Sequence, residues 1–258
     1  MKKLSVSYFL IKKWVICFSF LILSSSVLQA EWDPINYLDD ITESTFDRLE
    51  DPAFKDMKER VMVCLSQSWC SSEKINLLMD LIVLTQPKVC VEIGAFAGAS
   101  VMPVAETLKY LQNGTVFAID AWSNDEAVKY LANDDSNKIW WSQINMKKTY
   151  KAFNRLFKRW DLYSYCTVIH KPSEEAVHEV NNIDFLHIDG NFSEIGSLRD
   201  VELYLPKVKS GGYVLLSNLF LMAPNNHQPK LKAFSKLFET CEVVAEIEQN
   251  NAVLMRKE

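Results

Sequence analysis

The sequence predicts an α/β protein built on a mostly parallel β-sheet of about seven strands, with helices on both faces. Short β-branched runs alternate with helical segments from about residue 72 onward. These runs are apolar along almost their whole length, which is typical of strands covered on both faces. Two further strand-like runs flank Gln249-Asn250-Asn251, a hairpin signal that predicts an added antiparallel strand at the C-terminus.

The elements follow one another in a regular order. The stretch "SSEKINLLMDLIVLTQP" predicts a helix that opens on a serine N-cap and ends at Pro87. After it, the apolar runs predict strands, and the amphipathic segments between them predict helices. The expected strands are 88–94, 115–120, 166–170, 183–189 and 213–218, and the expected helices are 100–114, 126–160, 173–181 and 197–212.

Residues 1–30 differ from the rest of the chain. Four lysines precede the apolar run "WVICFSFLIL", and "SSSVLQA" follows, with no acidic residue before Glu31. This order is that of a secretory signal peptide, with cleavage after Ala30, or of an N-terminal anchor. It predicts a periplasmic, secreted or membrane-anchored protein, or a cytoplasmic one if the segment is not a functional signal. Residues 31–71 then form a helical extension, and residues 72–258 form the main domain.

Composition narrows the range of partners. The net charge is -5 and the isoelectric point is near 5.5, which argues against nucleic acid because phosphate neutralisation needs a dense basic face. Contact with a membrane is expected only through the N-terminal segment. Cys64 and Cys70 can pair if the protein is exported. A small molecule is therefore the expected partner.

The residues that are candidates for ligand binding or catalysis fall at the ends of successive predicted strands. They are Glu92 to Gly94, Asp120, residues 170–173, Asp189 with Gly190, and Ser217 with Asn218. In an open parallel sheet, ligands bind beyond the carboxyl ends of the strands. The sequence therefore predicts that these side chains converge on one crevice.

The stretch "VCVEIGAFAGAS" indicates which ligand this crevice accepts. Its pattern, Glu92-x-Gly94-x-x-x-Gly98, lacks the G-x-G-x-x-G arrangement that receives a pyrophosphate. A ligand with positive charge and no phosphate, such as S-adenosylmethionine, fits an acidic residue better. Asp120 is placed to bind ribose hydroxyls, a role that dinucleotide folds share. The two glycines also have a simpler interpretation, which is tight packing of strand against helix.

Several motifs together resemble the class I S-adenosylmethionine-dependent methyltransferases, and most closely the catechol and macrocin O-methyltransferase-like groups. They are "VEIGAFAGAS", "FAIDAW", "KPSEEAV" and "IDFLHIDGNFSEIGSLRDVELYLPKVKSGGYVLLSN". The resemblance implies a Rossmann-like fold. It also implies roles for individual residues: cofactor contacts by Gly94, Phe96, Gly98, Ser100 and Asp120, a position near the adenine for Ser173 and Glu174, and catalytic roles for Asp189 and Asn218. Glu92 is assigned to the cofactor on its charge, because a nearby carboxylate stabilises the sulfonium and the ammonium.

The chain departs from this family at the metal site. Catechol-type relatives hold magnesium with an acid after the fourth strand and an Asp-Asn or Asp-Asp pair after the fifth, whereas this chain has Ser217 in place of the second acid. Losing a carboxylate removes much of the attraction that offsets dehydration of the ion. Asn191 and Phe192 stand where relatives offer a base. We therefore expect either metal-independent transfer or cofactor binding without turnover.

Three functions remain open. The first is O-methylation of a small or exposed acceptor. The second is an exported cofactor-binding or interaction protein with a degenerate site, because S-adenosylmethionine is made in the cytosol. A nicotinamide-dependent oxidoreductase is weaker, since its phosphate-binding pattern is missing. Of the other candidates, His187 is expected to be a buried structural histidine, Ser173 also suits a helix N-cap, and Trp140 and Trp141 line a pocket or pack as a lid.

Overall fold

The structure is a computed structural model, and it describes residues 33–34, 38, 41, 43–222, 227–248 and 251–258. The chain divides into residues 1–30 and a compact unit of residues 31–258, and all described residues belong to the second unit. The predicted signal peptide or anchor lies outside the described residues. Within the described ranges, no helix is both long enough and apolar enough to cross a membrane.

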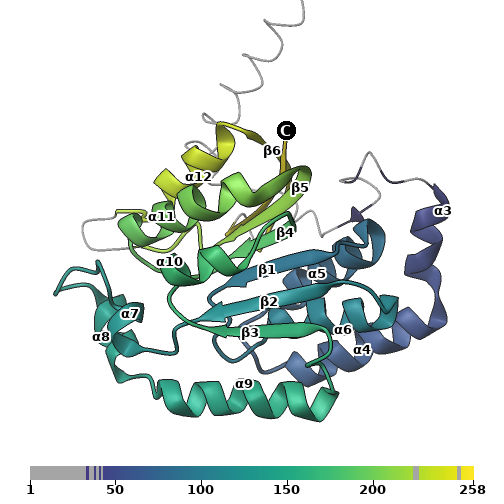
Figure 1. Cartoon of the computed structure of the whole chain (residues 1–258), viewed down its shortest axis with the longest axis horizontal. Helices are drawn as coiled ribbons and strands as arrows, with labels where there is room; N and C mark the ends of the chain where they lie inside the picture. The colour runs from purple at the N-terminus through teal and green to yellow at the C-terminus, as the bar shows by residue number, and fades with distance from the viewer. Residues whose placement is uncertain (1–32, 35–37, 39–40, 42, 223–226, 249–250) are drawn as a thin grey trace, which may run out of the picture. The chain divides into compact units, whose positions relative to one another are not determined.

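A seven-stranded sheet in the order β3-β2-β1-β4-β5-β7-β6 forms the centre of this unit (Figure 1). The first five strands pair in parallel, β7 runs antiparallel to β5, and β6 runs antiparallel to β7. The predicted parallel sheet with a C-terminal antiparallel hairpin is thus confirmed. The strands are β1 (Val89–Ile93), β2 (Thr115–Asp120), β3 (Cys166–His170), β4 (Ile183–Ile188), β5 (Val208–Ser217), β6 (Cys241–Ile247) and β7 (Ala252–Lys257).

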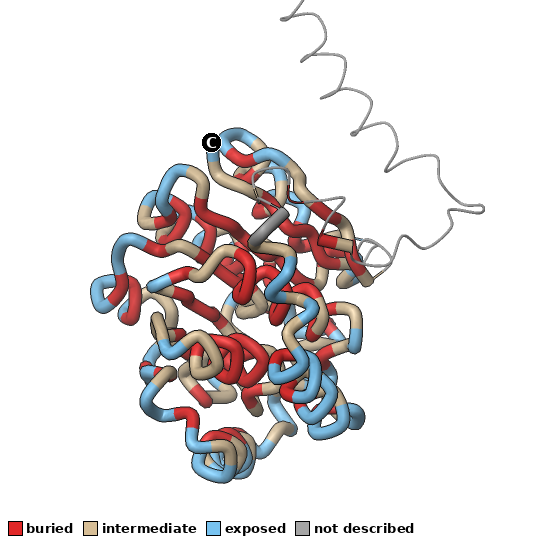
Figure 2. The backbone as a smooth tube through the Cα atoms, turned by 90° about the vertical axis from the view of Figure 1, so that its right-hand side faces the viewer, coloured by how far each residue is buried: buried red, intermediate tan, exposed pale blue. Residues whose placement is uncertain are grey.

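Helices cover both faces of the sheet. On one side pack α4 (Pro52–Leu65), α5 (Ser72–Thr85), α6 (Val101–Leu111) and α9 (Met146–Trp160), and on the other α10 (Ser173–Ala176), α11 (Glu194–Tyr204) and α12 (Leu231–Phe238). Successive strand residues point to opposite faces, so Cys90 joins the first core cluster and Val91 the second. Figure 2 shows these buried strands running through the middle of the unit.

The remaining elements are short. They are α3 (Glu43–Phe46), α7 (Asn124–Ala127) and α8 (Ser136–Gln143), with 3-10 turns η1 (Asp47–Glu50), η2 (Val177–Glu179) and η3 (Leu205–Lys207). Helix α4 places Phe54, Met57 and Val61 in the same core cluster as α5. The described part of the predicted extension therefore packs on the main domain rather than standing apart from it.

Local signals explain where helices start. The Ser71 hydroxyl accepts the Lys74 N–H at 3.0 Å, which confirms the predicted N-cap of α5. The prediction of one helix over 126–160 is wrong, because Asp135 and Asn145 each accept a backbone N–H two or three residues ahead and begin new helices there.

Two other boundaries also differ from the prediction. Pro206 lies in the turn that ends α11, so the backbone is already extended at Val208 and β5 starts five residues early. At α10 the N-cap is Pro172 rather than Ser173, because the Ser173 hydroxyl donates to Asp200 instead.

Candidate active site

A cavity of about 240 Å³ opens at the carboxyl ends of the central strands. Gly94 follows β1, Asp120 ends β2, Asp189 follows β4 and Asn218 follows β5, and all four line it. Because β1 lies between β2 and β4 in the sheet, the cavity spans Asp120 on one side and Asp189 on the other. The parallel-sheet rule thus located the cavity correctly.

The β1–α6 loop is held in an unusual backbone conformation. Gly94, Phe96 and Gly98 all have positive φ angles, of 94°, 43° and 86°. A Cβ on Gly94 would lie 2.5 Å from the carbonyl oxygen of Asp189, and one on Gly98 would lie 2.8 Å from the Phe157 ring. Gly94 therefore lets the ends of β1 and β4 approach each other, and Gly98 lets the loop pack on α9.

Asp120 anchors this loop. Its two carboxylate oxygens accept the backbone N–H groups of Phe96 at 2.8 Å and Trp122 at 2.6 Å, and the Trp122 indole donates back to the Phe96 carbonyl at 2.8 Å. Burial raises the pKa of Asp120, although the two backbone hydrogen bonds oppose that shift. Each oxygen keeps a further lone pair for a ligand hydroxyl.

A chain of buried polar groups runs beneath the cavity without lining it. The Ser100 hydroxyl donates to Glu92, Glu92 Oε2 lies 3.0 Å from His187 Nδ1, and His187 Nε2 lies 2.9 Å from the Ser217 hydroxyl. Glu92 is 1% exposed, and His187 and Ser217 are fully buried. The sequence predicts that Glu92 and Ser100 contact the cofactor. In the described part of the structure they instead belong to this chain of buried polar groups, and neither lines the cavity.

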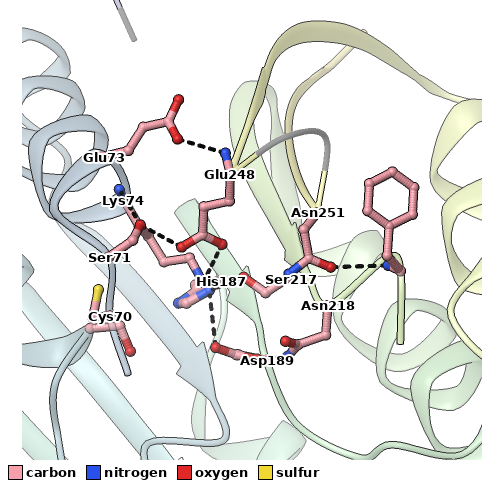
Figure 3. Close-up of polar contacts among 12 residues, drawn as sticks. Cys70, Ser71, Glu73, Lys74, His187, Asp189, Ser217, Asn218, Glu248 and Asn251 are labelled. Carbon is pink, nitrogen blue, oxygen red and sulfur yellow. Dashed lines mark hydrogen bonds and ion pairs between the residues drawn. The ribbon is translucent and has the colours of Figure 1, made fainter. Parts of the chain in front are cut away.

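Asp189 and Asn218 face each other at the opposite side of the cavity from Asp120. The Asn218 side-chain amide donates to Asp189 Oδ1, and His187 Nε2 lies 3.8 Å from Asp189 Oδ2. Lys74, from the first turn of α5, lines the same cavity. Figure 3 shows these groups with Glu248, whose Oε2 lies 3.1 Å from the Lys74 ammonium nitrogen.

The wall nearest β3 is polar. Ser173 donates to Asp200 Oδ1 at 2.5 Å, and Glu174 pairs with Arg199 at 3.1 Å and Lys129 at 3.8 Å. Burial raises the pKa of Asp200 to about 6 against the opposing hydrogen bond from Ser173. All five residues line the cavity, so this end carries several charges of both signs.

Aromatic rings form the rest of the wall. Trp69 stacks on Phe96 with ring centroids 5.1 Å apart, and Trp141 meets both Phe96 and Phe192 edge-on or tilted. These four rings line the cavity, whereas Trp140 packs outside it on Trp69 and Trp141. The two tryptophans therefore differ in role. Trp141 lines the pocket, as one interpretation of the sequence expects, whereas Trp140 packs against other rings, as the alternative interpretation expects.

A lysine supports the loop after β4 from below. Lys230 is fully buried, donates to the Asn191 carbonyl at 2.8 Å and lies 5.8 Å from the centre of the Phe192 ring. Burial lowers its pKa, and Asp189 and Asp200 oppose that shift. It does not line the cavity within the described part of the chain.

Sequence reasoning missed Trp69, Lys74, Asp200 and Lys230. Only Lys74 left a detectable signal, which is a cation in the first turn of a predicted helix, where the helix dipole disfavours it. The others sit in ordinary helical or loop patterns and reach the site only through the fold. His170, considered as a crevice residue, binds the Ala121 carbonyl and packs on Trp122.

The donor set does not fit a divalent metal. Across the described ranges, no group of three or more His, Cys, Asp or Glu side chains is arranged to hold one. Within the described part of the chain, Asp189 is the one carboxylate to which Asn218 is hydrogen-bonded. Ser217 is buried against His187, and Lys74 lines the same cavity. A fixed cation beside a single carboxylate opposes binding of a second cation. Cys64 and Cys70 are free.

The chain is similar to known methyltransferases. A family model described as a methyltransferase domain matches residues 91–219, half of the chain, and no curated protein matches. Among solved structures, the SAH-bound methyltransferase PaMTH1 of Podospora anserina is 15% identical, with a TM-score of 0.55 over 91% of this chain and 99% of that one. The SAH-bound O-methyltransferase of Bacillus cereus is 12% identical, with a TM-score of 0.52 over 88% and 98%. At such identities the likeness concerns the fold.

Proposed function

This chain belongs to the methyltransferase-domain family, and we propose that it binds S-adenosylmethionine in the cavity and methylates an oxygen atom of a small acceptor. The observation that carries the proposal is the continuous cavity from Asp120, past Gly94, to Asp189. A carboxylate at each end and a glycine at the centre suit an elongated, positively charged ligand. The SAH-bound relatives named above share the fold.

The residues present fit the nucleoside part of this ligand. Asp120 is held in place by two backbone N–H groups and retains lone pairs for the ribose hydroxyls. Ser173 and Glu174 lie at the same end, beside Asp200, where we place the adenine. Phe96 and its stacking partner Trp69 supply an apolar surface for the ligand.

Glu92, Gly98 and Ser100 act indirectly in this proposal. Glu92 is buried between Ser100 and His187, so it fixes the start of α6 and the end of β4 rather than touching the ligand. Gly98 acts through its packing on Phe157. These three residues are therefore positioning residues.

The bound donor supplies an activated methyl group, and the protein aligns an acceptor with it. Asp189 and Asn218, at the far side of the cavity from Asp120, are placed to orient the acceptor oxygen. Alignment of reacting atoms can contribute about 7 to 11 kcal/mol when the geometry is good. No step needs a metal ion.

We further propose that residues 1–30 direct export. The basis is the run of lysines, the apolar segment and the small residues before Glu31.

Calorimetry tests the cofactor assignment. The full chain should bind S-adenosylhomocysteine and not NAD, because the pyrophosphate-binding pattern is missing. Asp120→Ala should weaken S-adenosylhomocysteine binding by about 1.5 to 3 kcal/mol, the value of charge-assisted hydrogen bonds. Asp56→Ala, which removes a mostly exposed acid paired with Arg60 on α4, is the control. Equal affinity of the Asp120→Ala variant and the parent would refute the ribose assignment.

A further inference from the structure

Lys74 is a buried cation on the wall of the cavity. Its side chain is 7% exposed, and its ammonium nitrogen lies 3.1 Å from Glu248 Oε2. Burying a charge is unfavourable unless it is paired, and a cation in the first turn of a helix also meets the positive end of the helix dipole. Both effects oppose a lysine at this position, so its placement requires specific support from the fold.

Glu248 gives that support, and it is itself held firmly. Its Oε1 accepts the Ser71 hydroxyl at 2.5 Å, and its backbone N–H donates to Glu73 at 2.8 Å. Glu248 follows β6 with a φ of 53°, a strained conformation for this residue type. The end of the β6–β7 hairpin is therefore fastened to the start of α5 around Lys74 (Figure 3).

The ammonium has hydrogen-bonding capacity left for a ligand. It carries three N–H donors, and within the described residues Glu248 is its one close carboxylate partner. Lys74 shares the cavity wall with Asp189 and Asn218 and with the Trp69 and Phe192 rings. A cation, an oriented carboxylate–amide pair and aromatic surfaces thus line the same cavity.

Lys74 remains charged at neutral pH. Burial lowers its pKa, but the carboxylates of Asp189 and Glu248 outweigh burial and hold the pKa above its ordinary value. A permanently protonated amine cannot accept a proton from the acceptor. Its role at the site is therefore electrostatic.

We propose that the Lys74 ammonium contacts the reacting oxygen of the acceptor and stabilises it as an anion, taking the place of a divalent metal at the Asp189–Asn218 side of the cavity. The proposal rests on the proposed function and names its acceptor class, which is a compound with an acidic hydroxyl. A cation beside that hydroxyl lowers its pKa, so its proton leaves to water before transfer.

The transfer step then balances without a basic residue. The acceptor oxyanion forms the new O–C bond while the S–CH₃ bond breaks and leaves its electron pair on sulfur, giving a neutral thioether. One proton has gone to solvent. Lys74 stays protonated throughout, and it holds the oxyanion together with the second N–H of the Asn218 amide. Asp189, which only accepts hydrogen bonds, keeps that amide oriented.

The experiment uses 4-nitrophenol as the probe, because its anion absorbs visible light. The full chain is saturated with S-adenosylhomocysteine, and the ionisation of the bound probe is followed by absorbance across a pH series. In the parent, the bound probe should ionise at a pH about 1 to 3 lower than in water, which is at least a tenfold larger ionisation constant.

Four variants make the result specific. Lys74→Met should abolish the shift, and Lys74→Arg should retain part of it. Lys74→Met combined with Glu248→Gln removes both charges of the buried pair, so the double variant should fold even if the single variant misfolds. It too should lack the shift. Lys58→Met is the matched control, because Lys58, on α4, pairs at 2.6 Å with Asp80 on α5, the helix that carries Lys74, and does not line the cavity.

The outcomes separate this proposal from the cofactor assignment. If S-adenosylhomocysteine binds but the shift persists in the double variant, the role of Lys74 is refuted while the cofactor assignment stands. Absence of probe binding to the loaded parent also overturns it, because an aromatic cavity with a buried cation should retain a small aryl oxyanion. Failure of S-adenosylhomocysteine to bind the parent refutes the proposed function itself.

Discussion

Gly94 allows a direct test of how the site is built. The structure predicts that Gly94→Ala destabilises the fold and weakens cofactor binding. The new Cβ would lie 2.5 Å from the Asp189 carbonyl oxygen and 2.9 Å from the Gly190 Cα. These atoms belong to the backbone after β4 and cannot rotate away. The obstacle is therefore the end of β4, not only the ligand, and the change should disturb Asp189 even without cofactor.

Gly211 provides the matched control. It also has a positive φ, of 77°, but a Cβ there would meet only the Arg256 guanidinium at 3.6 Å. Both variants place alanine in left-handed backbone, which costs about 1–2 kcal/mol, offset by about 0.4–1 kcal/mol from the lower entropy of the unfolded chain. Gly211→Ala should thus lose about 0 to 1.6 kcal/mol.

Gly94→Ala adds the steric term. Overpacking of a tight site typically costs about 1–3 kcal/mol, so Gly94→Ala should lose about 1 to 4.6 kcal/mol in the free energy of unfolding, which is about 1–3 kcal/mol more than Gly211→Ala, measured by urea denaturation. The same variant should bind S-adenosylhomocysteine more weakly in calorimetry, whereas Gly211→Ala should bind like the parent. Equal destabilisation by the two changes would refute the packing argument.

Three further predictions follow from the site and the N-terminus. Burial raises the pKa of Asp200 from 3.8 to about 6, so the folded state binds the proton more tightly, and this contribution to stability is full below pH 3.8 and is lost as the pH rises to 6. Across that interval the parent should lose up to about 3 kcal/mol relative to Asp200→Asn in urea denaturation, and parallel curves would contradict it. Titration of the full chain with Mg²⁺ should give no tight binding, because Ser217 replaces a carboxylate and Lys74 supplies a cation; micromolar affinity would overturn the metal-free site. Residues 1–35 fused to a reporter should carry it across the inner membrane of a bacterium, and a wholly cytosolic reporter would contradict export.

The order of helices and strands was predictable because it depends on near neighbours. Apolar runs such as residues 115–120 predict buried strands. Ser71 caps α5 by accepting the backbone N–H of Lys74, three residues ahead. The predicted helix boundaries were wrong where side chains compete with the helix for backbone hydrogen bonds. Asp135 and Asn145 each offered a cap inside what reads as one helical stretch, and periodicity alone does not weigh a cap against continuation.

Part of the site was predictable for a topological reason. Parallel strands carry their carboxyl ends to one edge, so Gly94, Asp120, Asp189 and Asn218 were expected to meet, and all four line one cavity. The same rule does not say which way a side chain points. Glu92 lies one residue from the strand end, and alternation directs it beneath the cavity toward His187.

The sequence by itself determined the class of fold, the edge of the sheet where the cavity opens and the missing acid at Ser217, since each depends on local pattern or residue identity. Only the tertiary structure decided that Lys74 pairs with Glu248 and lines the cavity with Asp189. It also decided that the Ser217 hydroxyl is hydrogen-bonded to His187. These contacts join residues far apart in the chain. The first depends on the packing of α5 against the β6–β7 hairpin, and the second depends on the pairing of β4 with β5. That packing is a property of the whole fold, which no local pattern contains.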